Sequence, residues 1–177
     1  DLERYRRHVP GMTLVGKAHY LLAALEVDGA GAVAGEVTEQ IMAVSSQSGG
    51  KLQFTEILDD SYSRILATPL RANCAVLTGL TGMAAGGEAP GMKGDEPFRM
   101  MRAITQTRGS RDHWENTQEN IFCMNSIVDY SRVYERVEPR MTFRAYLDDR
   151  SIGEARFEDL RDRPVTFRRP IGKGDPG

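Results

Sequence analysis

Cysteine, histidine and long apolar runs are all scarce in this sequence of 177 residues. Its two cysteines, Cys74 and Cys123, lie among apolar residues and are too few for a disulfide framework, so we expect two buried thiols in a reducing compartment. No apolar run approaches the length that spans a bilayer, so no membrane partner is expected. No secretory signal is visible, and a first residue of Asp rather than Met is compatible with earlier removal of a targeting peptide.

The residue patterns that mark catalytic and metal sites are missing as well. The three histidines show no metal-ligand spacing with either cysteine. No serine lies in a nucleophile elbow, and Cys123 has no adjacent base. The acidic pairs Asp59-Asp60 and Asp148-Asp149 are typical of exposed turns. We therefore expect a protein that is not an enzyme and has no cofactor and no metal site.

The net charge of -2 hides an uneven distribution of charge along the chain. Residues 12–97 carry five basic and ten acidic side chains, whereas residues 98–177 carry fifteen basic side chains, fourteen of them Arg, and thirteen acidic ones. An Arg-rich half favours contact with phosphates, although the interspersed acids equally suit a solvated surface of mixed charge.

Residues 120–147 carry the strongest pattern of secondary structure. The apolar run Ile121-Phe122-Cys123-Met124 has the length of a buried strand. Within residues 128–137 the valines then recur at helical spacing, and Pro139 ends the expected helix. Residues 141–147 alternate between apolar and polar side chains, as in a half-buried strand that ends at Asp148-Asp149. A helix between two strands of a small closed sheet is typical of the OB-fold barrel.

Several other segments also favour a mainly β fold. We expect strands at residues 12–15, 74–80 and 98–107, and a hairpin that joins residues 33–44 to 52–58 across Ser48-Gly49-Gly50. Residues 19–27 suit either helix or strand, residues 61–70 suit one or two helical turns, and the Gly-rich residues 79–94 suit a loop.

Four separate blocks resemble the OB-fold single-stranded-DNA-binding proteins of bacteria and mitochondria. They are Met12-Thr13-Leu14-Val15-Gly16-Lys17, Phe98-Arg99-Met100-Met101, Asn120-Ile121-Phe122-Cys123-Met124 and Met141-Thr142-Phe143-Arg144-Ala145-Tyr146-Leu147. The same order with long insertions is similar to OB-fold subunits of the kinetoplastid mitochondrial RNA-editing complexes. The resemblance implies one domain over residues 1–177, with a barrel, one intervening helix and a large insertion at about 18–97.

The same resemblance implies a function in binding single-stranded nucleic acid, RNA slightly before DNA, inside a larger assembly. Such binding needs cations for the phosphates and aromatic faces for the bases. The candidate side chains are Lys17, Arg99, Arg102, Trp114, Arg144 and Tyr146. The implied partners are the nucleic acid and other protein subunits, including OB-fold proteins, and the implied location is intracellular, in the mitochondrion.

Two alternatives belong to other functional classes. The chain is also compatible with a structural assembly module, in which Arg99, Arg102 and Tyr146 contact protein rather than bases. A nucleotide-binding α/β protein is the other alternative, because a candidate strand at residues 21–27 precedes Gly29-Ala30-Gly31, with Glu56 or Asp59 as a later ribose ligand. Glu26 and Asp28 would repel a phosphate there, and an ordinary Gly/Ala turn explains the same residues.

Overall fold

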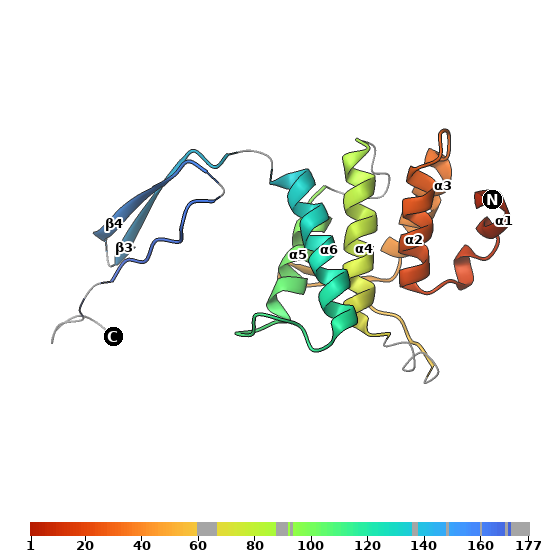
Figure 1. Ribbon diagram of the computed structural model, residues 1–177, viewed down its shortest axis with the longest axis horizontal. Coiled ribbons are helices and arrows are strands. Elements are labelled where there is room, and N and C mark those ends of the chain that lie inside the picture. The colour runs from red at the N-terminus through yellow and green to blue at the C-terminus, as the bar shows by residue number, and fades with distance from the viewer. Residues whose placement is uncertain are drawn as a thin grey trace. The chain divides into compact units, whose positions relative to one another are not determined.

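The structure, a computed structural model, describes residues 1–59, 67–87, 92, 94–135, 138–147, 149–159, 161–168 and 170. It divides into two compact units, Asp1–Val133 and Tyr134–Gly177. Helices form most of the first unit, and an antiparallel hairpin is the main element of the second (Figure 1).

The helical unit is built around α4. Its helices are α1 (Leu2–Arg6), the 3-10 helix η1 (Val9–Gly11), α2 (Leu14–Leu25), α3 (Gly31–Met42), α4 (Pro69–Ala85), α5 (Glu96–Gln106) and α6 (Thr117–Tyr134). Helix α2 packs against both α3 and α4, and α4 also packs against α5. In Figure 1, α4 lies between α2 and α6.

The start and the buried face of α4 follow directly from its sequence. The hydroxyl of Thr68 accepts a hydrogen bond from the Arg71 amide at 3.1 Å, and Pro69 occupies the first turn, where its missing N–H costs nothing. Buried residues then recur at helical spacing: Ala72, Ala75, Val76, Gly79, Leu80 and Met83. A Cβ on Gly79 would lie 3.3 Å from the Leu21 side chain, so glycine at this position permits the close approach of α2.

A small hairpin covers α4 and α5. Strands β1 (Ser45–Ser48) and β2 (Lys51–Phe54) pair across Gly49 and Gly50, whose φ angles of 56° and 72° suit the tight turn that joins them. The side chain of Asn73 on α4 fixes β2 in place. Its Oδ1 accepts from the Phe54 amide, and its Nδ2 donates to the Phe54 carbonyl, both at 2.8 Å. This pair of bonds anchors the buried Phe54 to the central helix.

The expectation of two free thiols is wrong, because Cys74 and Cys123 form a disulfide between α4 and α6. Their Cα atoms are 4.8 Å apart, and both side chains are buried. The two residues are separated by 49 positions in sequence, so their proximity depends on the packing of two helices.

The prediction of a mainly β, OB-like barrel is also wrong. Helix dominates the described residues, and their strands form two separate two-stranded sheets with no closed barrel. Three of the four blocks that carried the family resemblance lie largely or wholly in helices: residues 14–17 begin α2, 98–101 belong to α5 and 120–124 belong to α6. The proposed insertion at 18–97 therefore does not separate two strands of a barrel.

Four other sequence-based expectations need correction. Residues 74–80 and 98–107 were expected as strands, but residues 74–80 lie in α4 and residues 98–106 lie in α5. Residues 74–80 are buried almost continuously, and continuous apolarity does not distinguish a buried helix from a strand. Residues 33–42 are helical in α3, so only the Gly49-Gly50 turn and residues 52–54 of the expected hairpin are confirmed. The expected loop at 79–94 begins with the last turns of α4. A helix rather than a strand precedes Gly29, which removes the structural basis of the nucleotide-binding alternative.

Helix α6 corrects the boundaries expected near the centre of the chain. It begins at Thr117 and includes both the expected strand at 120–124 and most of the expected helix at 128–137. Positions 136 and 137 lie outside the described residues, as do positions 61–66 and 88–91, where helical turns and a loop were expected.

Candidate interaction surfaces

The second unit contains a hairpin whose two faces differ in chemistry. Strands β3 (Met141–Leu147) and β4 (Arg150–Phe157) pair antiparallel, and this confirms the strand expected at 141–147. Asp149 lies in a turn before β4, and position 148 of the expected turn lies outside the described residues. Because side chains alternate along a strand, cross-strand pairs share a face. The pairs Met141 with Phe157, Phe143 with Ala155 and Ala145 with Gly153 lie on one side, which we call the apolar face.

Large side chains on the apolar face are open to solvent. Met141 is 52% exposed, Phe143 is 49% exposed and Leu147 is 40% exposed. A two-stranded hairpin is marginally stable in water by itself, and a sheet usually buries its apolar side against another layer. The apolar face is therefore a surface that gains stability when another layer covers it.

The opposite face of the hairpin is polar. Arg144 Nε donates to Glu154 at 2.6 Å, and Arg156 forms an ion pair with Glu158 at 2.9 Å. The hydrogen bond to Glu154, followed by the charge of this carboxylate, raises the pKa of Arg144. Tyr146 follows Arg144 on the same side and is 58% exposed. Carboxylates thus neutralise both arginines of the polar face.

A compact turn follows β4. The carboxylate of Asp162 accepts hydrogen bonds from the amides of Glu158 at 2.7 Å and Asp159 at 3.0 Å. Asp159 in turn accepts from the Arg161 amide at 2.8 Å. The bond from Asp159, followed by that from Glu158, lowers the pKa of Asp162 below its ordinary value of 3.8.

We expect this turn to loosen in acid. A carboxylate with a lowered pKa in the folded state stabilises the fold above its unfolded pKa of 3.8, and the contribution disappears as pH falls through the lower, folded value. The amide resonances of Glu158 and Asp159, followed by NMR from pH 7 to pH 2, should shift in this acidic range. Asp162→Asn should remove the part of this shift that reports the two hydrogen bonds to Asp162. A wild-type profile that matches the variant would contradict this role of Asp162.

The helical unit carries a hollow of ≈ 390 Å³ between α2, α4 and α6, whose lining includes His19, Phe122 and Val128. Phe122 makes two ring contacts here. The His19 ring meets the Phe122 ring edge-on, with centroids 6.1 Å apart, and the Arg71 guanidinium lies 4.9 Å from the centroid of the Phe122 ring. Asp129 and Arg132, also in the lining, form an ion pair at 3.6 Å. These contacts stabilise the junction of the three helices.

Two buried carboxylates are potential catalytic groups, but each serves the start of a helix. Glu119 accepts from the Thr68 hydroxyl at 2.8 Å and from the Glu115 amide at 3.2 Å, and Glu96 accepts from the Gly94 amide at 2.8 Å. Within the described ranges, no group of three His, Cys, Asp or Glu side chains is arranged to hold a metal ion. No helix in these same ranges has the length and hydropathy needed to cross a membrane.

Of the six side chains predicted to bind nucleic acid, the four that lie in the helical unit do not gather in one site. Lys17 lies on α2, half-buried. Arg99 and Arg102 lie on α5 next to the β1–β2 hairpin, where Arg99 donates to Gln47 at 2.9 Å and Arg102 reaches Gly50. Trp114 is 2% exposed, and its indole N–H donates to Thr107 at 2.9 Å, so its ring offers no face to a base.

Arg144 and Tyr146 are neighbours on one face of β3, and Arg99 and Arg102 lie about one helical turn apart on α5. Comparison with known proteins assigns no family to the chain. No family model matches it, and neither a curated protein nor a solved structure matches it significantly. The surfaces of the molecule are therefore the basis for inferring its function.

The apolar face could be predicted from the sequence. Met141, Phe143 and Leu147 alternate with polar residues, which signals one side that requires cover. Within a barrel this side would be the closed core, and only the structure shows that the sheet ends at two strands in the described part of the chain.

Proposed function

We propose that this chain is a non-catalytic interaction segment of a larger protein assembly, and that the apolar face of the β3–β4 hairpin is its binding surface. The observation that carries the proposal is the exposure of Met141, Phe143 and Leu147 on one side of a two-stranded sheet. Exposed apolar groups gathered on one side are typical of protein interaction sites.

The chemistry of the hairpin favours a polypeptide sheet or strand as the partner. A second β layer packs about 10 Å from the first and interdigitates its side chains with those of the apolar face. The ion pair between Arg144 and Glu154 keeps the polar face compatible with water. The hairpin thus has the amphipathic pattern of one half of a two-layer sheet.

Replacing one aromatic side chain on each face tests this proposal. Phe143→Ser should move the tagged chain to a smaller sedimentation coefficient in extracts of the cells that make it, because an apolar contact is lost. Tyr146→Ser is the matched control, since it removes an aromatic ring of similar exposure from the polar face, and it should leave sedimentation unchanged. An unchanged coefficient for Phe143→Ser would remove the apolar face from the proposal.

Single-stranded nucleic-acid binding is a second candidate, now supported by one pair of neighbours, Arg144 and Tyr146. A guanidinium and an exposed aromatic ring on one face are the groups that bind phosphates and stack on bases. Fluorescence polarisation with labelled single-stranded RNA and DNA across a salt series separates this candidate from the first. Salt-sensitive binding that Arg144→Ala with Tyr146→Ala abolishes would favour it.

A further inference from the structure

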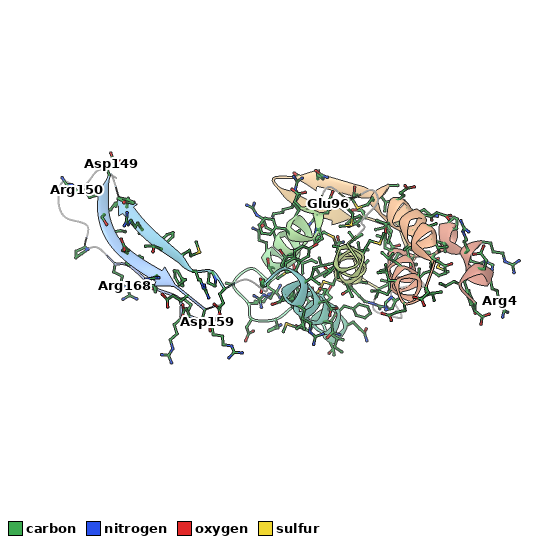
Figure 2. The ribbon with its side chains drawn as sticks, turned by 90° about the horizontal axis from the view of Figure 1, so that it is seen from above. Arg4, Glu96, Asp149, Arg150, Asp159 and Arg168 are labelled. Carbon is green, nitrogen blue, oxygen red and sulfur yellow. A yellow bond between two sulfur atoms is a disulfide. The ribbon has the colours of Figure 1, made fainter. Side chains whose placement is uncertain are left out.

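The chain that follows β4 turns back and lies against the hairpin. The turn held by Asp162 reverses its direction, and the blue chain in Figure 1 then returns beside β3 and β4. In Figure 2, Asp149 and Arg150 mark one end of the hairpin and Asp159 the other, while Arg168 lies alongside. We call residues 161–168 the strap.

One contact fixes where the strap meets the hairpin. A Cβ placed on Gly153 would overlap the Cγ, Cδ1 and Cε1 atoms of Phe167, so this ring rests directly on the bare backbone of β4. Since Gly153 pairs with Ala145, the ring lies on the apolar face. The missing side chain of Gly153 leaves a recess on the apolar face, which we call the Gly153 notch, and the Phe167 ring fills it.

The strap has the pattern of a β-strand. Val165 and Phe167 alternate with Thr166 and Arg168, and Pro164 precedes them. These residues have no assigned secondary structure and are not part of either sheet. The strap contacts the apolar face through the Phe167 side chain, and Met141 and Phe143 stay half-exposed.

We propose that the strap is a built-in competitor for the apolar face, and that the partner is an extended polypeptide strand whose own aromatic side chain replaces Phe167 in the Gly153 notch. The inference rests on the proposed function, because it assumes that the apolar face is where the partner binds. The strap itself shows the chemistry that fits: an aromatic ring two positions after a branched apolar residue. Binding of the partner then requires the strap to leave.

The competitor model makes a direct prediction for a labelled peptide of residues 161–168. In the wild-type protein the tethered strap competes at a high effective concentration, so the peptide should bind weakly. Phe167→Ala empties the notch, and fluorescence polarisation should show binding that is about tenfold tighter or better. A peptide that carries Ala in place of Phe167 is the control and should bind neither protein.

A second substitution at the notch keeps the model falsifiable. Gly153→Ala, combined with Phe167→Ala, places a methyl group where the ring sits and should abolish the gain in peptide binding. Amide hydrogen exchange of β3 in each variant verifies that the hairpin is intact. Equal peptide affinity for the wild type and Phe167→Ala, or affinity that does not depend on Gly153, would overturn the model.

The failure of this inference and that of the proposed function can be told apart. If the peptide binds the wild type and Phe167→Ala with equal affinity but Phe143→Ser still reduces the sedimentation coefficient, the apolar face binds a partner and the strap is only part of the hairpin fold. If Phe167→Ala binds the peptide but Phe143→Ser leaves sedimentation unchanged, the notch exists and the proposed function is wrong.

Discussion

Replacing both cysteines, Cys74→Ala with Cys123→Ala, should lower the free energy of unfolding by about 3–5 kcal/mol. The bond joins α4 to α6 across a sequence separation of 49 residues, so its loss frees a long loop in the unfolded chain. Both side chains are also buried, and their removal takes apolar contacts from the core. Urea denaturation followed by circular dichroism measures the change.

Reduction provides the control for the double variant. Wild-type protein that is unfolded and refolded with a reductant should approach the stability of the double variant, whereas the double variant should not respond to the reductant. Unfolded, unreduced wild-type protein should show no reactive thiol. Two reactive thiols per chain, or equal stability of the wild type and the variant, would contradict the disulfide.

Asn73→Ala should lower the free energy of unfolding by about 2–6 kcal/mol. Its side-chain amide pairs with both the amide and the carbonyl of Phe54, and also donates to the Pro69 carbonyl at 2.8 Å. Without it, two backbone groups of a buried residue lose their partners, and each buried unsatisfied group costs about 1–3 kcal/mol. The β1–β2 hairpin should exchange its amide protons faster in this variant, because Asn73 anchors β2 to α4.

The same substitution at an exposed amide is the matched control. Asn125 lies on α6 with its side chain exposed, and Asn125→Ala should change stability by no more than about 0.5 kcal/mol. Similar losses for both variants would contradict the anchoring role of Asn73.

The sequence contains enough information to predict parts of this fold. The start of α4 is marked by Thr68-Pro69, and its buried face by the spacing of Ala72, Val76 and Leu80. Proline is favoured in the first turn of a helix, so Pro69 is itself a signal for the start of α4. The alternation across residues 141–147 correctly predicted β3, because successive side chains of a strand point to opposite faces and an amphipathic strand therefore alternates between apolar and polar residues.

Other features depend on tertiary structure. The run Ile121-Phe122-Cys123-Met124 lies in a helix that places Cys123 in the core and leaves Ile121 and Met124 half-exposed, so its apolar residues follow no single face. Continuous apolarity of this kind does not distinguish helix from strand. The disulfide depends on the approach of α4 to α6, and Trp114 is buried in the core, where its indole N–H donates to Thr107.

Site-specific photo-crosslinking tests the central claim most directly, because it reports what covers each face of the hairpin in the cell. Benzoylphenylalanine would replace Phe143 on the apolar face and, in a separate protein, Tyr146 on the polar face. The account predicts crosslinks from position 143 to one polypeptide segment, identified by mass spectrometry, and few from position 146. Crosslinks from position 146 alone, or equal crosslinking from both positions, would contradict it.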